Sequence, residues 1–247
     1  MINYYQLYDY AHKSENAEEH SQTLAQLLEH TTTHFNLNKR FQNLLEIGCG
    51  QGNNVQAFLE NCSRYHGIDI SENALDHALK NKTDESDFSL HDICGATFQN
   101  DFILKSQFDC IVDGHCLHCI TDPEHRKVYL SQVYKLLSED GYFICETMIA
   151  TKQMSFDYPL IYDENEGVLW KEISEDLSHF VNPDQIYSRY GTHFMPYRAL
   201  HTPLQIEEEI LSAGLKIDYF FCDQYAEFVI PEMRNSQVLR FICHKDF

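Results

Sequence analysis

The sequence predicts an α/β fold in which helices flank a mostly parallel, doubly wound sheet. Short apolar segments with strand character alternate with segments of helical periodicity, and a glycine-rich loop follows the first of them. Strands are expected at 44–47, 65–70, 88–92, 108–113 and 142–147. Because strand, crossover helix and strand follow one another repeatedly, the pairing is expected to be parallel.

Each expected helix carries a signal at its start or its end. One helix face is indicated by the spacing of Val55, Phe58, Leu59 and Cys62. Ser71 is suited to cap the next helix, whose expected inward residues are Ala74, Leu75, Ala78 and Leu79. Asp122 and Pro123 are typical of an N-cap and a first helical residue, and Gly141 is expected to end that helix.

The C-terminal part differs from this alternation. Thr202 and Gln205 form a capping-box pattern, and Gly214 is expected to end the helix that they begin. Segments 215–222 and 237–244 alternate like strands with no clear helix between them, which predicts an antiparallel edge pair.

Residues 150–200 show little periodicity but are rich in aromatic side chains, so an ordered insertion is expected rather than disorder. We predict one domain for residues 1–247. It would comprise an N-terminal helical cap (1–41), a cofactor-binding core (42–150), a lid or substrate insertion (151–200), and a C-terminal helix with edge strands (201–247).

Charge and composition limit the classes of partner. With 18 Lys and Arg against 38 Asp and Glu, the net charge is −20, which disfavours nucleic acid and anionic lipid surfaces. The N-terminus lacks the pattern of a signal peptide, and no apolar run approaches transmembrane length. The nine cysteines lie mostly in apolar runs, as expected for reduced thiols, so a cytoplasmic location is predicted.

The glycine loop indicates a cationic cofactor without phosphates. A dinucleotide-binding loop has the spacing Gly-x-Gly-x-x-Gly, which places a helix N-terminus against a pyrophosphate. Here the spacing is Gly48-x-Gly50-x-Gly52, and Glu46 precedes the first glycine by two residues. Such an acid is poorly placed beside a pyrophosphate but well placed beside a sulfonium-bearing amino acid.

Carboxylates stand at the ends of three successive expected strands. Besides Glu46, Asp69 ends the second strand, where it could accept both hydroxyls of a ribose, and Asp92 ends the third, beside the expected adenine ring. One such acid is commonly a helix cap, but three together with the glycine loop indicate a nucleoside-like cofactor.

These segments resemble the class I, seven-stranded S-adenosylmethionine-dependent methyltransferases of the small-molecule type. The matching stretches are 44–52 (LLEIGCGQG), 67–71 (GIDIS), 108–118 (FDCIVDGHCLH) and 136–143 (LLSEDGYF); in the last, Glu139-Asp140-Gly141 replaces the family's usual Pro-Gly-Gly. The resemblance covers 42–147 well and 198–247 loosely. It implies a strand order of 3-2-1-4-5-7-6 with the last strand antiparallel, helices on both faces, and S-adenosylmethionine as cofactor.

The resemblance also implies roles for individual residues. The 48–52 loop would hold the methionine moiety, Asp69 the ribose and Asp92 the adenine amino group, while the 113–115 turn would contact the methionine ammonium. The implied cofactor site comprises Glu46, Gly48, Cys49, Gly50, Gly52, Asp69, Ile70, Asp92, Ile93, Asp113 and Gly114.

Residues 115–119 (His-Cys-Leu-His-Cys) follow the fourth strand, where the methyl group should point. They could form a wall of the active site, a metal site or a redox pair. No second ligand pair follows for zinc and no thioredoxin-like context surrounds the Cys-x-x-Cys, so we predict a wall and no metal. His115 is the candidate general base, because imidazole titrates near neutral pH.

The predicted function is methyl transfer to a small organic acceptor at oxygen, nitrogen or a carboxyl group. Aromatic residues and scarce cations of the 151–200 insertion are expected to bind the acceptor together with His118; they are Trp170, Arg189, Tyr197 and Arg198. A nicotinamide-dependent oxidoreductase and a non-catalytic binding module of the same fold are the alternatives. The glycine spacing disfavours the first, and the intact glycine and acid set disfavours the second.

Overall fold

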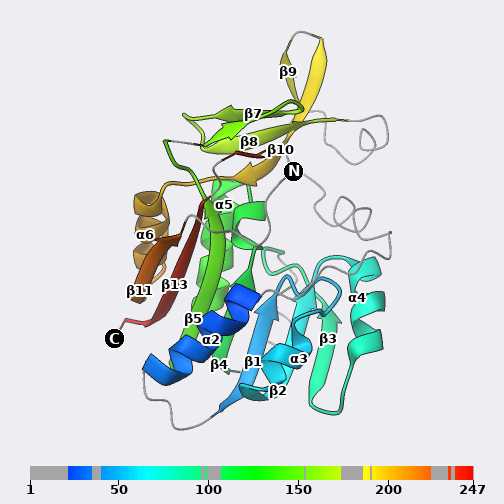
Figure 1. The fold of residues 1–247 in the computed structure, drawn as a ribbon, viewed down its shortest axis with the longest axis vertical. Coiled ribbons are helices and arrows are strands. Elements are labelled where there is room, and N and C mark those ends of the chain that lie inside the picture. The colour runs from blue at the N-terminus through cyan, green and yellow to red at the C-terminus, as the bar shows by residue number, and fades with distance from the viewer. Residues whose placement is uncertain are drawn as a thin grey trace.

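The computed structural model describes residues 22–34, 40–95, 98, 107–152, 154–173, 186–189, 191–223, 233–234 and 237–246. Its main feature is a seven-stranded sheet in the order β11-β13-β5-β4-β1-β2-β3 (Figure 1). Its strands are β1 (Phe41–Ile47), β2 (Cys62–Asp69), β3 (Ser86–Leu90), β4 (Phe108–Gly114), β5 (Leu137–Ile149), β11 (Leu215–Asp223) and β13 (Gln237–Lys245).

The topology confirms the predicted order and the predicted direction of the last strand. Strands β1 to β5 pair in parallel. Strand β13 is antiparallel to β5 on one side and to β11 on the other. The carboxyl ends of β1, β2, β4 and β5 therefore lie along one edge of the sheet, where ligands bind in folds of this kind.

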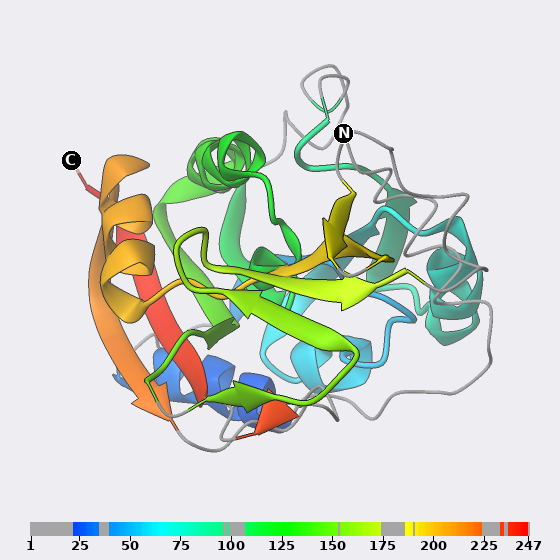
Figure 2. The same cartoon turned by 90° about the horizontal axis from the view of Figure 1, so that it is seen from above.

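Helices cover both faces of the sheet, as predicted. Helices α2 (Gln22–His34), α3 (Val55–Leu59) and α4 (Glu72–Ala78) contribute to one buried cluster. Helices α5 (Pro123–Leu136) and α6 (Pro203–Ser212) contribute to the other (Figures 1 and 2). Within β4, Cys110 and Val112 belong to the first cluster and Ile111 to the second, because successive side chains of a strand alternate between faces.

The local signals at the helix ends are largely confirmed. Ser71 caps α4, Asp122 caps α5, and Thr202 and Gln205 form the capping box of α6. Several expected details were wrong. Cys62 begins β2 instead of ending a helix, Leu79 is 49% exposed, and α5 ends at Leu136, where the extended backbone of Leu137 starts β5.

The insertion contains a second sheet that the sequence did not predict. Strands β7 (Leu160–Asp163), β8 (Val168–Glu172), β10 (Thr192–Ala199) and β9 (Tyr187–Arg189) form an antiparallel sheet in that order. Two short strands, β6 (Ser155–Phe156) and β12 (Met233–Arg234), pair beside it. Seen from above, this small sheet lies over the carboxyl edge of the main sheet (Figure 2).

The small sheet is attached to the end of β5. Leu160, Leu169 and Leu200 form a buried cluster with Met148 and Ala150. Of the predicted N-terminal cap, only α2 and residues 40–41 are described, and α2 packs against β5 and α3. Within the described ranges, no helix combines the length and apolar character that crossing a bilayer requires.

Candidate active site

The glycine loop lies between the end of β1 and α3. Gly48, Gly50 and Gly52 all have positive φ, at 72°, 52° and 73°, a conformation that other residues adopt only with strain. The amides of Gly48 and Cys49 both donate to the carbonyl of Ile68, which ties the loop to the end of β2. The chain therefore presents bare backbone at the carboxyl edge of the sheet.

Asp69 links this loop to the next helix. Its carboxylate accepts from the amide of Gly50 at 2.8 Å and from the amide of Ser71 at 2.9 Å. The residue is only 9% exposed, at the end of β2. One side chain thus fixes the position of the glycine loop relative to the start of α4, and Ile70 lies half-buried between them.

Glu46 lies beneath the loop and is 2% exposed. Its carboxyl group accepts hydrogen bonds from the Asn54 amide at 2.6 Å and from the Tyr65 hydroxyl. Burial raises the pKa of Glu46 to about 7, although both hydrogen bonds act in the opposite direction. The predicted acid is therefore present beside the loop, but as a buried group that titrates near neutral pH.

The third predicted acid occupies a different environment. Strand β3 ends at Leu90, so Asp92 lies in the turn that follows instead of in the strand. It is exposed and accepts from the amide of Cys94 at 2.9 Å, while its neighbour Ile93 is buried.

Asp113 is fully buried at the end of β4 and stabilises the turn that follows. Its carboxyl group accepts from the amides of Cys116 and Leu117 and from the Tyr129 hydroxyl. Burial raises its pKa to about 6. A Cβ on Gly114 would lie 2.6 Å from Cδ2 of Leu24 on α2, so a larger residue here would require the Leu24 side chain to shift.

His115 has φ 80°, an unusual conformation for a residue other than glycine. Its Nε2 lies 3.0 Å from Oε1 of the buried Glu146 on β5, and its side chain is 18% exposed. Its neighbour Cys116 would lie 3.0 Å from a Cβ on Gly48, so this turn packs directly against the glycine loop. The structure thus brings the candidate base to the candidate cofactor site.

His118 lies in the 3₁₀ turn η4 (Leu117–Cys119) and is buried. The amide of Met148 donates to its Nδ1 at 3.2 Å, so the proton of the neutral ring is on Nε2. Burial lowers the pKa of His118 well below its ordinary value, and the charge of Arg198 lowers it further. The ring is therefore a neutral hydrogen-bond donor.

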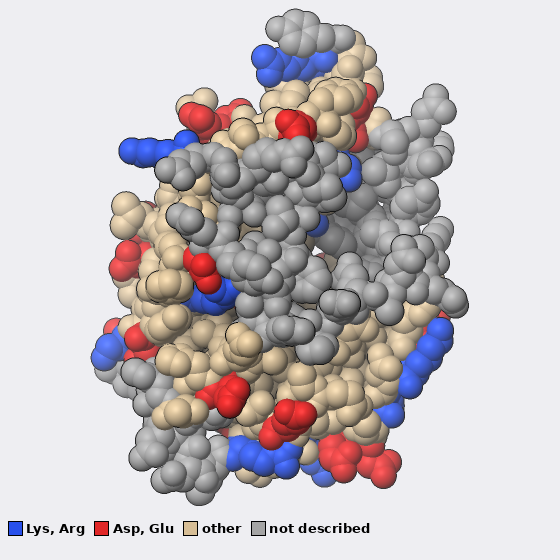
Figure 3. All heavy atoms as spheres, in the orientation of Figure 1, with Lys and Arg blue, Asp and Glu red and all other residues tan. Residues whose placement is uncertain are grey.

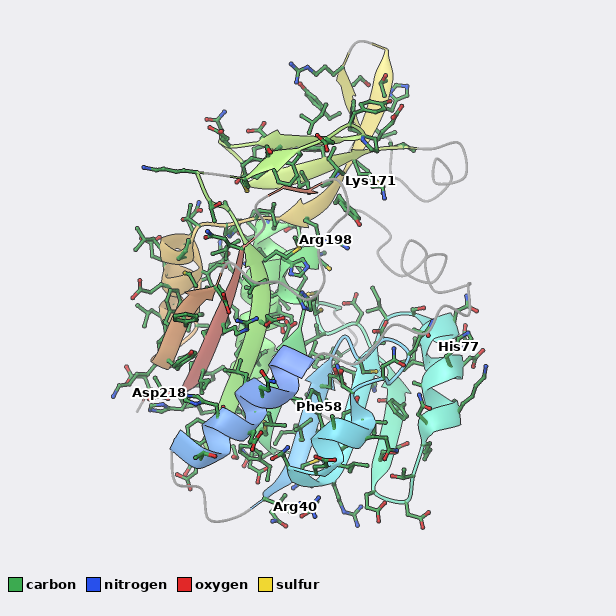
Figure 4. The ribbon with its side chains drawn as sticks, in the orientation of Figure 1. Arg40, Phe58, His77, Lys171, Arg198 and Asp218 are labelled. Atoms are coloured by element: carbon green, nitrogen blue, oxygen red, sulfur yellow. The ribbon has the colours of Figure 1, made fainter. Side chains whose placement is uncertain are left out.

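Tyr197 and Arg198 lie on the side of the small sheet that faces the main domain. Strand β10 has an irregular register between Pro196 and Arg198, so Arg198 pairs with Leu169 of β8. The guanidinium lies 3.9 Å from the centroid of the Tyr197 ring. Figure 4 shows Arg198 between the two sheets, above the ends of the central strands.

Trp170 and Arg189 are not brought to the same place. Trp170 is the neighbour of Leu169 on β8 and so points to the opposite face from Arg198, where its ring contacts that of Tyr187. Arg189 is exposed in β9, the strand of the small sheet farthest from the main sheet (Figure 1). The five predicted acceptor-binding residues therefore divide into a group at the site and a pair away from it.

Burial and hydrogen bonding act on the two thiols of the 115–119 segment. Burial raises the pKa of Cys116 well above its ordinary value, which disfavours the thiolate that metal binding or disulfide exchange requires. The Cys119 thiol donates to the carbonyl of His115. Among the described residues, no three His, Cys, Asp or Glu side chains are grouped so that they could hold a metal ion.

Several residues of the site had no signal in the sequence that we used. They are Asn54, Tyr65, Tyr129, Glu146, and Arg240 of β13, which donates a hydrogen bond to Glu146. Glu146 was visible only as a charged residue inside an apolar strand segment, a pattern that suggests a buried, paired carboxylate.

On the face shown in Figure 3, Lys and Arg side chains of the described residues are dispersed and form no continuous basic patch.

Comparison with known proteins agrees with this geometry. Residues 45–143 match a family model described as a methyltransferase domain. An uncharacterized methyltransferase of Schizosaccharomyces pombe is 28% identical over 113 residues, which are 44% of this chain and 73% of that protein.

Solved structures share the fold at low identity. An S-adenosylmethionine-dependent methyltransferase from Clostridium acetobutylicum aligns with a TM-score of 0.63 and 15% identity, covering 99% of this chain and 100% of the other. The 1,6-didemethyltoxoflavin-N1-methyltransferase of Burkholderia thailandensis, with 1,6-didemethyltoxoflavin and S-adenosylhomocysteine bound, aligns at 0.57 and 18%, covering 92% and 78%. Together with the strand order, these similarities show that the chain has the class I, Rossmann-like methyltransferase fold, and that residues 45–143 are similar to a methyltransferase domain.

Proposed function

We propose that this chain transfers the methyl group of S-adenosylmethionine to a small organic acceptor that binds where the small sheet covers the carboxyl edge of the main sheet. The observation that carries the proposal is the loop of three glycines with positive φ, held by Asp69 and packed against the His115 turn. The net charge of −20 favours a small acceptor over a nucleic acid.

The residues present fit the methyl donor. The glycine loop offers a cradle without side chains for the methionine moiety, and the Asp113–Gly114 turn stands next to it. Asp69 would accept from the ribose hydroxyls, and Asp92 and Ile93 would flank the adenine. The carboxyl groups of Glu46 and Asp113 lie near the loop, where a cationic ligand would favour their ionised forms.

When bound, S-adenosylmethionine supplies a methyl group on a positively charged sulfur. The work of the protein is then to orient the acceptor and exclude water. The small sheet excludes solvent from above, His118 offers an Nε2–H donor, and Arg198 offers a cation for one anionic group of the acceptor. His115 stands where it could remove a proton from the acceptor.

Two experiments test the proposal. Calorimetric titration with S-adenosylmethionine and NADH side by side should show binding of the first only, and NADH binding alone would point to an oxidoreductase. Incubation with a labelled methyl donor and a metabolite pool, followed by mass spectrometry, should then yield a labelled small product. Faster labelling of bulk RNA or DNA would contradict the proposed acceptor class.

We also propose a cytoplasmic location, since all nine cysteines are free thiols.

The variant Arg198→Ala should raise the acceptor's KM by about 10- to 150-fold, the effect of losing one charged hydrogen bond of about 1.5–3 kcal/mol. The Kd of S-adenosylmethionine should not change, because Arg198 belongs to the small sheet. Arg189→Ala is the matched comparison and should have the smaller effect, since β9 lies farther from the site. Equal effects of the two variants on KM would contradict this placement.

Binding of the donor should release protons near neutral pH. A nearby cation favours the ionised form of Glu46, whose pKa of about 7 leaves it partly protonated in the free protein. The binding enthalpy at pH 7 should therefore differ between phosphate and Tris buffers, which have different heats of ionisation, and the difference should shrink at pH 9. Identical enthalpies in both buffers at pH 7 would count against a protonated Glu46, and Glu46→Gln serves as the control.

A further inference from the structure

Three charged side chains and His115 form a continuous series. Asp223 on β11 pairs with Arg240 on β13, and Nε of Arg240 donates to Oε2 of Glu146 on β5 at 2.5 Å. The other oxygen of Glu146 lies 3.0 Å from Nε2 of His115. The contact between Arg240 and Glu146 follows from the strand register, because the two residues are direct partners in the antiparallel pair of β13 and β5.

The charge of Glu146 is retained although its side chain is inaccessible to solvent. Burial raises its pKa, but the contacts with His115 and Arg240 outweigh burial, so the pKa lies below its ordinary value. A buried carboxylate of this kind is costly unless each oxygen has a partner. Arg240 serves one oxygen and His115 the other.

The position of His115 is fixed by the backbone as well. Its amide donates to the carbonyl of Glu146 at 3.1 Å, and its φ of 80° turns the ring back toward β5. Strained backbone of this kind persists only where surrounding contacts impose it, and it is common at active sites. Two separate contacts thus hold this ring against one residue of the neighbouring strand.

We propose that Glu146, itself held by Arg240, is a positioning residue that keeps the proton of neutral His115 on Nε2 and so makes Nδ1 the basic atom for the methyl acceptor. This inference rests on the proposed function and narrows it, because only a hydroxyl or a protonated amine needs a base; a carboxylate acceptor does not. Nε2 of His115 lies 3.0 Å from Oε1 of Glu146 but lacks the alignment of a hydrogen bond, as is common before a ligand tightens a site.

The step balances as a proton transfer coupled to displacement. The acceptor's proton passes to Nδ1, and its lone pair forms the bond to the methyl carbon. The carbon–sulfur bond breaks, and its electron pair remains on sulfur, which becomes a neutral thioether. The imidazolium formed on His115 is then stabilised by the Glu146 carboxylate.

Charged groups on the neighbouring elements lie close to the His115 ring. Glu146 on β5 and Asp113 on β4 are the nearby carboxyl groups. The rings of His118 in η4 and His115 are arranged edge to face, with their centroids 5.5 Å apart, and His118 is neutral because burial lowers its pKa. The nearby cations are Arg198 on β10 and Arg240 on β13.

The first experiment needs no acceptor. Long-range ¹H–¹⁵N correlation spectra of ¹⁵N-histidine-labelled protein should show the Nε2–H form of His115 in the wild type and a mixture of both tautomers in Glu146→Gln. The control Asp218→Asn breaks a second histidine–carboxylate pair, between Asp218 on β11 and His244 on β13, and should leave the His115 signals unchanged. An Nδ1–H form in the wild type, or no change in Glu146→Gln, would overturn the proposal.

The second experiment uses the acceptor found by the metabolite screen. Glu146→Gln should lower kcat by about 10- to 100-fold, less than the about 10²- to 10⁴-fold expected on removal of a base. KM should stay unchanged, and the acid limb of the pH–rate profile should move to lower pH because the imidazolium loses its carboxylate. A kcat that does not depend on pH on the acid side would contradict the proposal.

A third variant distinguishes a loss of turnover caused by the missing carboxylate from one caused by misfolding of Glu146→Gln. His115→Gly suits the positive φ and leaves room for added imidazole, which should restore turnover more when Glu146 is present than in the double variant with Glu146→Gln. Equal rescue in both would exclude a role for Glu146. If no acceptor is methylated at all, the proposed function fails, while the spectra still decide the tautomer independently.

Discussion

Replacing Asp69 by alanine is expected to weaken S-adenosylmethionine binding by about 10- to 150-fold, which corresponds to about 1.5–3 kcal/mol for a lost charged hydrogen bond. In the proposed complex, the carboxylate would serve the ribose while it also holds the amides of Gly50 and Ser71. The substitution would remove the ligand contact and loosen the glycine loop together. Isothermal titration of the purified variant measures the loss directly.

Two further variants serve as comparisons for Asp69→Ala. Asp69→Asn keeps an oxygen for one backbone amide and should bind with intermediate affinity. Asp87→Ala on the neighbouring strand β3 removes an exposed carboxylate that pairs with Lys82, and it should bind like the wild type. If Asp69→Ala kept full affinity while Asp87→Ala lost it, the cofactor site would have to be placed elsewhere.

The variant Glu209→Gln is expected to lower the free energy of unfolding by about 3–5 kcal/mol, because it leaves a buried guanidinium without its charge partner. Arg126 on α5 is 2% exposed and donates to both oxygens of Glu209 on α6 and to the carbonyl of Leu117 in η4. Urea unfolding at pH 7 measures this loss. The control Glu208→Gln alters the exposed neighbour and should change the free energy by less than about 0.5 kcal/mol.

The same pair sets a dependence of stability on pH. Burial alone would raise the pKa of Glu209, but Arg126 and His201 lower it from 4.5 to about 2. The folded protein therefore binds fewer protons than the unfolded chain between these values. The stabilisation is complete above pH 4.5 and is lost as the pH falls toward 2. The difference between wild type and Glu209→Gln should be constant above pH 5 and should narrow at pH 3; a difference that widened on acidification would contradict the assignment.

The core of the fold could be predicted because each buried parallel strand corresponds to a separate apolar segment of the sequence. The positions of Asp69 and the glycine loop follow from these segments, since the carboxyl ends of parallel strands meet at one edge. The contact between Glu146 and Arg240 could not be predicted in this way. It depends on the register of an antiparallel pair, and a shift by one residue would place the two side chains on opposite faces.

The small sheet was missed for a related reason. Its strands are between three and eight residues long, and the irregularity at Tyr197 breaks the alternation that identifies a strand. In a regular strand, Arg198 would share a face with Pro196 and therefore with Trp170. The extra residue moves Arg198 to the face of Leu169, so the sequence alone could not separate the two predicted acceptor-binding residues.

The segment of chain that forms the small sheet begins just after β5 and ends just before α6, and its two ends lie close together. The amide of Ala150, just after β5, donates to the carbonyl of His201, just before α6. Its removal or exchange would therefore leave the order of the seven strands and their cofactor loop intact. Exchange of this one segment would therefore change the residues that face the proposed acceptor while the loop proposed to hold the methyl donor stayed in place.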